Sequence, residues 1–152
     1  MTPSAPIALG CDHAGFELKE ILKSFLTDNG FDLEDCGTDG TDSVDYTEFG
    51  ARVARKVASG QYQRAVLICG TGLGMSMIAN RFTGVRAALC NDLFSAIMCR
   101  RHNDANLLVL GVRLVGRDLA LEILRAWLDT PFDGGRHKER IANIDIQAKE
   151  GA

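Results

Sequence analysis

One segment of the chain has the residue types and the spacing of a site that holds negative charge. It reads Cys69-Gly70-Thr71-Gly72-Leu73-Gly74-Met75-Ser76, with three alternate glycines directly after an apolar run. Alternate glycines let the backbone turn tightly, so that N–H groups come close to an anion at the start of the following helix. The pattern therefore predicts an anion or oxyanion nest. The alternative is a tight turn that binds no ligand.

Three familiar phosphate-binding loops do not fit this segment. A Walker A loop needs Gly-Lys-Ser/Thr after its glycines, and no such triplet follows here. The dinucleotide fingerprint needs a third glycine where Met75 stands. A Cys-x5-Arg phosphatase loop would need an arginine at that same position. The predicted nest is therefore not a standard nucleotide site.

Cys69 is the candidate for a reactive thiolate. It ends the apolar run and faces the nest, where N–H groups and a helix N-terminus stabilise negative charge on sulfur. The alternative is a small core residue, which is the role of most cysteines. Cys11 also ends an apolar run and is expected to pack. Cys36, Cys90 and Cys99 are expected to be structural.

The remaining candidates are three histidines and a short basic cluster. His13 follows Asp12 at the end of an apolar run, where it either forms a local hydrogen bond or binds a ligand. His102 closes a helical stretch, and its alternative role is a C-terminal cap. Arg136, His137, Lys138 and Arg140 form the basic cluster. That cluster is either a solvated tail or a clamp on phosphate, which suits the forked geometry of arginine.

Short apolar runs alternate with amphipathic stretches along the whole chain. The runs predict strands at 7–11, 31–36, 65–69, 85–90 and 107–110, and the stretches predict helices at 16–29, 47–59, from the glycine turn to about 82, 92–101 and 118–129. This alternation indicates a Rossmann-like α/β fold, a three-layer α/β/α sandwich around a five-stranded, mainly parallel sheet. We expect a single domain over residues 1–152, with a polar tail from about 131.

The predicted sheet places the candidate residues at one edge. Ligands of open α/β sheets bind beyond the carboxyl ends of the strands. The residues just after the strands are Asp12 and His13, the segment 69–74, and Asn91 with Asp92. These groups are therefore expected to lie near one another.

Composition and charge exclude several classes of protein. The net charge is −3, so neither a broad phosphate-neutralising surface nor a nucleic-acid partner is expected. The sequence has no apolar run of about 18 residues and no signal-peptide pattern, so no membrane association is expected. The cysteine count is odd, at 5, and no Cys-x-x-Cys pair occurs, which argues against a disulfide framework or a zinc site. Reduced thiols in a cytoplasmic protein are the simplest interpretation.

Six short motifs follow one another along the chain. They are Gly10-Cys11-Asp12-His13-Ala14-Gly15, Asp45-Tyr46, Cys69-Gly70-Thr71-Gly72-Leu73-Gly74, Gly84-Val85-Arg86-Ala87, His102-Asn103-Asp104-Ala105-Asn106 and Gly134-Gly135-Arg136-His137. In this order they resemble the type B ribose-5-phosphate isomerases, whose superfamily also holds allose-6-phosphate and galactose-6-phosphate isomerases. The resemblance spans residues 7 to about 145. Each motif alone is weak, but six in register are highly specific.

The resemblance implies a metal-free aldose–ketose isomerisation through an enediolate. Cys69 would be the base that moves the proton between C1 and C2. Thr71 and the amides of Gly70, Gly72, Leu73 and Gly74 would stabilise the enediolate oxygen as an oxyanion hole does. His102 would open the furanose ring by general acid–base transfer. A second subtype places a glutamate near position 75, where this chain has Met75, so the cysteine subtype is the better match.

The resemblance also assigns residues that hold the substrate. Asp12, His13 and Asn103 would hold sugar hydroxyls or the ring oxygen. Arg113, Arg136 and Arg140 would bind the phosphate, with His137 nearby. The resemblance further implies a homodimer, or a dimer of dimers, with active sites at the interface and with no cofactor or metal.

The sequence therefore predicts an isomerase that interconverts ribose 5-phosphate and ribulose 5-phosphate. One alternative is an isomerase of another aldose phosphate, such as allose 6-phosphate, galactose 6-phosphate or a tetrose phosphate. The other is a non-catalytic sugar-phosphate-binding module, which would have no use for Cys69 and His102.

Overall fold

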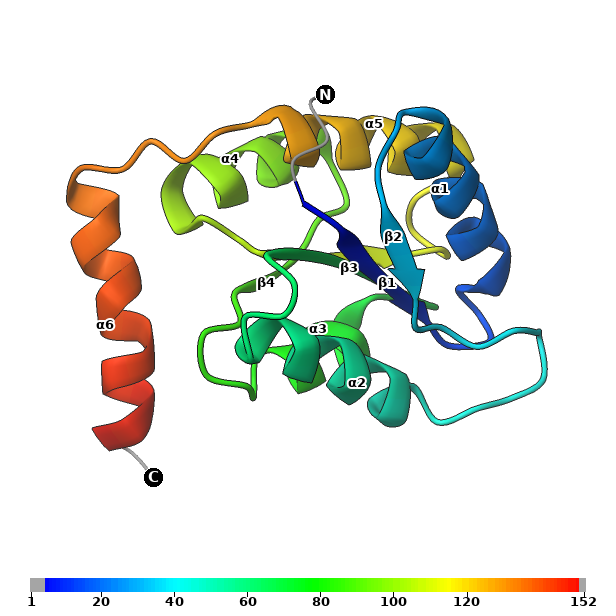
Figure 1. Cartoon of the computed structure of the whole chain (residues 1–152), viewed down its shortest axis with the longest axis horizontal. Helices are drawn as coiled ribbons and strands as arrows, with labels where there is room; N and C mark the ends of the chain where they lie inside the picture. Colours follow the sequence, from blue (N-terminus) through cyan, green and yellow to red (C-terminus); the bar gives the residue numbers. More distant parts are fainter. Residues whose placement is uncertain (1–4, 151–152) are drawn as a thin grey trace.

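Within residues 5–150, which the computed structural model describes, five strands form one sheet between layers of helices (Figure 1). The strands are β1 (Ile7–Cys11), β2 (Leu33–Asp35), β3 (Arg64–Cys69), β4 (Ala87–Leu89) and β5 (Leu107–Gly111). They lie in the order β2-β1-β3-β5-β4, and all of these pairings are parallel. The predicted Rossmann-like fold is confirmed, with a sheet that is parallel throughout.

The helices cover both faces of this sheet. They are α1 (Phe16–Asp28), α2 (Tyr46–Ala58), α3 (Leu73–Ala79), α4 (Leu93–Asn103), α5 (Arg117–Asp129) and α6 (Arg136–Glu150). Figure 1 shows α1, α4 and α5 on one face and α2 and α3 on the other. Among residues 5–150, no helix has the length and apolar character needed to cross a membrane.

The central strand β3 shows why both faces need a cover. Val66 and Ile68 pack into the core under α1 and α5, whereas Leu67 and Cys69 pack into the core under α2 and α3. Burying one aliphatic side chain of this size contributes about 1.5–3 kcal/mol. Because β3 lies between β1 and β5, its last residue, Cys69, comes to the middle of the carboxyl edge.

Helix α4 ends two residues later than the sequence predicts, at Asn103 rather than 101. Asp104 follows with a left-handed φ of 44°, and the Ala105 N–H donates to the Cys99 carbonyl at 3.0 Å. The Arg86 guanidinium adds a cap, because its Nε donates to the carbonyls of Asn103 and Asp104 at 3.0 and 3.1 Å. This cap comes from the approach to β4, so local sequence signals do not reveal it.

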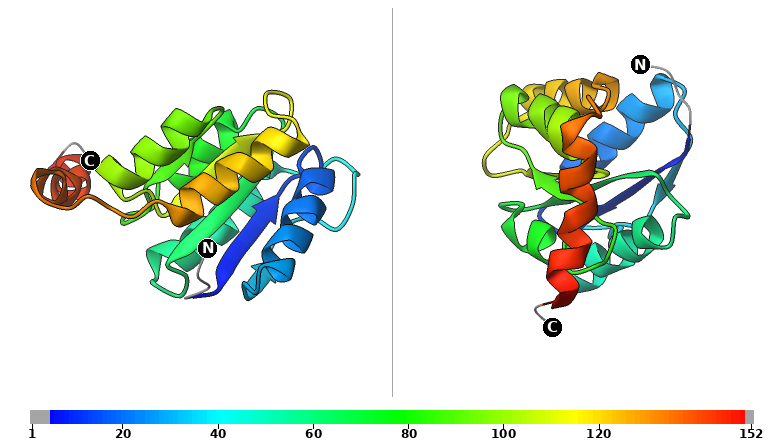
Figure 2. Two further views of the ribbon diagram at one scale, coloured as in Figure 1. Left: turned by 90° about the horizontal axis from the view of Figure 1, so that it is seen from above. Right: turned by 90° about the vertical axis from the view of Figure 1, so that its left-hand side faces the viewer.

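The segment from about residue 131, predicted to be a polar tail, contains a helix. Helix α6 stands at one end of the molecule, beyond α4 and the edge strand β4 (Figure 2). The Asp145 carboxylate holds it by accepting from the Gly84 N–H at 3.1 Å. Its apolar residues Ile144 and Ile146 are 47% and 50% exposed. The sequence signal was weak because so few apolar residues mark a buried face.

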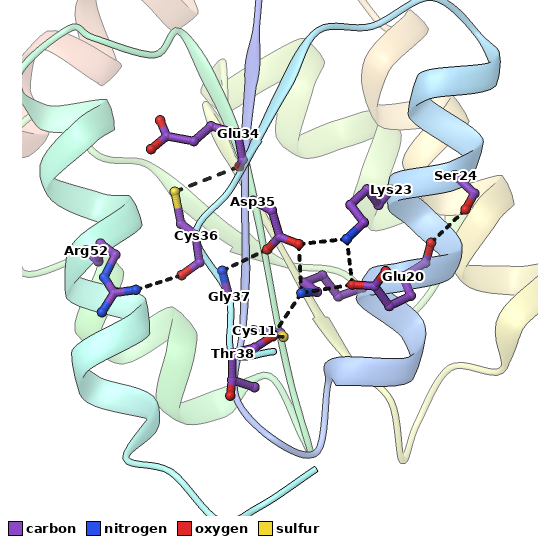
Figure 3. Close-up of polar contacts among 11 residues, drawn as sticks. Cys11, Glu20, Lys23, Ser24, Glu34, Asp35, Cys36, Gly37, Thr38 and Arg52 are labelled. Atoms are coloured by element: carbon purple, nitrogen blue, oxygen red, sulfur yellow. Dashed lines mark hydrogen bonds and ion pairs between the residues drawn. The ribbon is translucent and has the colours of Figure 1, made fainter. Parts of the chain in front are cut away.

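A buried lysine on α1 fixes the turn that follows β2, in the network drawn in Figure 3. Lys19 is 2% exposed, and its Nζ lies 2.8 Å from the Asp35 carboxylate and 2.9 Å from the Thr38 carbonyl. Burial opposes its charged form, but the bonds to Asp35 and Glu20 outweigh burial and raise the pKa of Lys19. Lys23 reaches the same Asp35 oxygen at 2.9 Å. The turn is thereby tied to α1 at the start of the loop that leads to α2.

Candidate active site

A cleft of about 420 Å³ opens at the carboxyl edge of the sheet. It gathers residues from the ends of β1, β3 and β5 and from the starts of α2 and α3, as expected for a doubly wound sheet. Its lining consists of Asp12, His13, Ala14, Tyr46, Cys69, Gly70, Thr71, Gly74, Met77 and Arg113. Seven of these were predicted as site residues, namely Asp12, His13, Cys69, Gly70, Thr71, Gly74 and Arg113.

Cys69 forms the floor of this cleft and is 5% exposed. Its Sγ accepts a hydrogen bond from the Gly72 N–H at 3.1 Å. A donor at this distance stabilises the sulfur when it carries negative charge. Gly72 reaches this position with a φ of 78°, in the left-handed region that favours glycine. The glycine at position 72 therefore lets the segment place a hydrogen-bond donor on the Cys69 sulfur itself.

The amides of the glycine-rich segment are only partly free for a ligand. The Gly72 N–H is bonded to Cys69, and the Leu73 N–H donates to Thr71 Oγ1 at 3.3 Å. Because Thr71 Oγ1 accepts this bond, its own proton remains to donate to a ligand. Of the donors predicted for an oxyanion, the Thr71 hydroxyl is thus better placed than the amides of Gly72 and Leu73.

Asp12 and His13 lie where β1 ends. Asp12 is 7% exposed, and one carboxylate oxygen accepts from the Gly15 N–H at 3.1 Å. His13 Nδ1 accepts from the Val44 N–H at 3.2 Å, which places the proton of the neutral ring on Nε2. Each side chain therefore has one anchored atom and another atom to offer to a ligand.

Tyr46 and Met77 also line the cleft, although no role there was predicted for either. A Cβ at Gly74 would lie 2.6 Å from the Tyr46 ring, so the glycine lets the ring pack against α3. Tyr46 belongs to the Asp45-Tyr46 motif, and that motif was the signal in the sequence that could have marked it. Met77 is 64% exposed, because it lies on the outer face of the short helix α3.

Arg113 brings positive charge to the rim of the cleft. Its backbone N–H donates to the Gly70 carbonyl at 2.9 Å, and its guanidinium lies against Gly70, where a Cβ would meet it at 3.4 Å. The turn after β5 is thus fastened to the glycine-rich segment. Arg113 itself remains exposed and free to meet an anion.

Four more of the predicted residues, His102, Asn103, His137 and Arg140, meet in a second cleft of about 350 Å³. Its lining is His102, Asn103, His137, Arg140, Ile141 and Ile144, from the end of α4 and from α6. The rings of His102 and His137 stack at 4.3 Å with an interplanar angle of 10°. The pKa of His137 is held below its usual value. The main cause is desolvation, and electrostatic repulsion from His102, Arg136 and Arg140 adds to it. Arg136 starts α6 and is exposed, outside the lining of both clefts.

The two clefts lie at opposite edges of the sheet and share no lining residue. Helix α4 follows β4 and leads to β5, and a crossover helix between parallel strands runs antiparallel to them. Its end, with His102 and Asn103, therefore comes to the amino edge, whereas Cys69 ends its strand at the carboxyl edge. A single chain does not bring these predicted partners together.

Two other cysteines contrast with Cys69. Burial raises the pKa of Cys11 and of Cys36 to about 11. Both are therefore neutral thiols near pH 7, in keeping with the packing and structural roles predicted for them.

Comparisons with known proteins match nearly the whole chain. Residues 7–144 match the model of a family described as Ribose/Galactose Isomerase. Ribose-5-phosphate isomerase B of Escherichia coli strain K12 is 44% identical over 138 residues, which cover 91% of this chain and 93% of that protein. A protein of Pectobacterium atrosepticum named D-erythrulose-4-phosphate isomerase is 38% identical over 139 residues, which cover 91% of each.

A solved structure shows the same fold at similar identity. Ribose-5-phosphate isomerase B of Clostridium thermocellum superposes with a TM-score of 0.94 at 48% identity. The match covers 97% of this chain and 99% of that one.

Proposed function

The chain belongs to the ribose/galactose isomerase family, and from this membership we propose that it interconverts ribose 5-phosphate and ribulose 5-phosphate. The observation that carries the proposal is the Cys69 sulfur under the Gly72 N–H, on the floor of a cleft with Asp12 and His13. A base beside hydrogen-bond donors is what proton transfer next to a carbonyl needs. The relatives named ribose-5-phosphate isomerase B supply the substrate class.

In the proposed reaction Cys69 is the base. Its sulfur takes the proton from C2 of the open-chain aldose and returns a proton to C1 by way of an enediolate, while the hydroxyl proton on O2 passes to O1. Negative charge develops on the oxygen at C1, and the Thr71 hydroxyl donates to it. One preorganised donor of this kind is worth about 2.7–4 kcal/mol of barrier.

Asp12 and His13 would orient the sugar beside the base. The Nε2–H of His13 is available to donate because Nδ1 is bonded to the Val44 N–H. The free oxygen of the Asp12 carboxylate is available to accept from a hydroxyl. Such positioning lowers the barrier because the reacting atoms no longer have to find each other.

The proposal includes a homodimer, or a dimer of dimers, in which each active site draws on two chains. His102, Asn103, His137 and Arg140 would enter the Cys69 cleft from the neighbouring chain on its α4–α6 end. In the segments that follow β3, β4 and β5 at the carboxyl edge of the sheet, exposed apolar side chains support contact with another chain, since isolated monomers rarely expose large apolar patches. They are Leu73, Met77, Leu93, Phe94 and Leu114, between 41% and 74% exposed.

The phosphate would be held by arginines from both sides of this interface. Arg113 is at the rim of the Cys69 cleft, and Arg136 and Arg140 stand on the first turns of α6. Guanidinium groups suit a phosphate because they form two parallel hydrogen bonds to its oxygens. The proposal also places the protein in the cytoplasm, where reducing conditions suit its five free cysteines.

Arg140→Ala is expected to raise the KM for ribose 5-phosphate by about tenfold or more, with a smaller change in kcat. A hydrogen bond to a charged group contributes about 1.5–3 kcal/mol, and phosphate binding is remote from the reacting carbons. Steady-state kinetics, with ribose 5-phosphate and with ribulose 5-phosphate as the substrate, measure the changes in KM and kcat separately. Lys138→Ala, on the same helix and exposed, is the matched control and should change KM little. An equal loss on unphosphorylated ribose would contradict the assignment.

A panel of phosphorylated aldoses tests the proposed substrate. Purified protein should convert ribose 5-phosphate with a higher kcat/KM than it shows for allose 6-phosphate, galactose 6-phosphate or erythrose 4-phosphate. Preference for the tetrose, as the name of the Pectobacterium relative suggests for that protein, would correct the substrate and keep the reaction class. Binding without turnover of any sugar would instead identify a sugar-phosphate-binding module.

A further inference from the structure

Two cysteines that the isomerase chemistry does not use lie in contact with each other. The sulfurs of Cys90, just after β4, and Cys99, on α4, are 3.9 Å apart. Each sulfur also contacts a backbone carbonyl, Cys90 that of Ala88 at 3.7 Å and Cys99 that of Ala96 at 3.3 Å. The sulfurs of Cys11, Cys36 and Cys69 likewise contact backbone groups, but among the described residues they have no hydrogen bond to another thiol. Among the five cysteines, all within the described residues, Cys90 and Cys99 are therefore the pair arranged to react together.

Solvent reaches one member of the pair. Cys90 is fully buried, whereas Cys99 is half-buried and lines a cavity of about 230 Å³ with Arg86, Asn103 and Ile144. The contact with Cys90 lowers the pKa of Cys99, and it is the largest influence. Burial acts in the opposite direction, the charge of Arg100 lowers the pKa further, and the net shift is downward. The contact with Cys99 and burial raise that of Cys90. A small oxidant entering the cavity thus meets the more nucleophilic thiol first.

We infer that Cys90 and Cys99 are a redox modification site, which hydrogen peroxide converts to a reversible disulfide that lowers the isomerase activity. The Cys99 sulfur attacks one peroxide oxygen, the O–O bond breaks, and the departing hydroxide takes the thiol proton to leave as water. The Cys90 sulfur then displaces hydroxide from the sulfenic acid of Cys99, and its own proton completes a second water. Two thiols are oxidised to one disulfide, and one peroxide is reduced to two waters.

The disulfide would act on the end of α4. A disulfide is about 2.05 Å long, so the two sulfurs must close by about 1.9 Å. The Cys90 N–H is bonded to the Val109 carbonyl at 3.1 Å, which anchors it to β5. Much of the shift therefore falls on Cys99, one turn before His102 and Asn103. The Ala105 N–H bonded to the Cys99 carbonyl carries the shift into the helix cap.

The test treats the purified full-length protein with hydrogen peroxide and follows both mass and turnover of ribose 5-phosphate. The expected result is a loss of two hydrogen atoms in mass, a 90–99 linkage in peptide mapping, and a fall in turnover of about tenfold or more. Dithiothreitol should restore both readouts. The mass readout is independent of the proposed isomerase function, so failure of that function does not obscure it.

Two variants separate this site from oxidation of Cys69. Cys99→Ser, at a half-buried position, should lose no hydrogen atoms and should keep more of its turnover after peroxide than the wild type. Cys36→Ser, with a buried thiol that has no thiol neighbour, should respond as the wild type does. The inference is overturned if no 90–99 linkage forms, if the linkage forms without loss of turnover, or if Cys99→Ser is inactivated equally.

Discussion

Cys69→Ser is expected to lower the turnover of ribose 5-phosphate by at least about a hundredfold while leaving its binding little changed. Serine keeps the size of the side chain and can still accept from the Gly72 N–H, so the cleft should keep its shape. Near neutral pH, however, a hydroxyl is a far weaker base than a thiolate for removing a proton from carbon. Steady-state kinetics give the turnover, and calorimetric titration gives the binding.

Cys36→Ser is the matched control for this substitution. Cys36 is also buried, its pKa is raised to about 11, and it lies outside the cleft. Its replacement should leave turnover close to that of the wild type. Unchanged turnover in Cys69→Ser would refute the role of Cys69 as the base, and loss of sugar binding in that variant would assign it to binding instead.

The sequence predicted the sheet and the Cys69 cleft because both follow from local patterns. Apolar runs such as β3 must be covered on both faces, and parallel strands bring their ends to one edge. Such a run is ended by Cys69 or followed by Asp12 and His13. That these residues lie close together could therefore be predicted without knowing how the side chains pack. The glycine pattern likewise predicted the turn, and the left-handed φ of Gly72 is its physical reason.

What the sequence could not show depends on contacts between distant segments. Helix α6 has few apolar residues and is held by Asp145 on the Gly84 amide, a bond that spans 61 residues. The cap of α4 relies on Arg86, again from another element. The outward position of Met77 depends on the shortness of α3. None of these has a signal in the spacing of nearby residues.

Of the features that the sequence could not show, the location of His102 matters most for the proposed mechanism. Its motif came with a role in ring opening from the family resemblance, but a helix that precedes β5 must end at the amino edge. Cys69 and His102 of one chain are thereby separated by the sheet itself. Proposed sharing of each site between two chains resolves this separation.

Mixed dimers of two variants should regain activity that neither variant has alone. Cys69→Ser lacks the base, and His102→Asn lacks the ring-opening group, so each homodimer should lose about a hundredfold or more in turnover of ribose 5-phosphate. A dimer with one chain of each kind has one site with both residues intact and one site with neither. Such a dimer should show about half the wild-type turnover, because closed two-fold symmetry gives two equivalent sites.

The assembly of one active site from two chains is tested most directly by isolating these mixed dimers. The two variants carry different affinity tags, are co-expressed, and are purified over both tags in succession before assay with ribose 5-phosphate. The matched control pairs Cys69→Ser with the double variant Cys69→Ser/His102→Asn, which cannot form a complete site and should stay inactive. Turnover near half of the wild-type value is the predicted result. Mixed dimers as inactive as the parent variants would contradict the shared site.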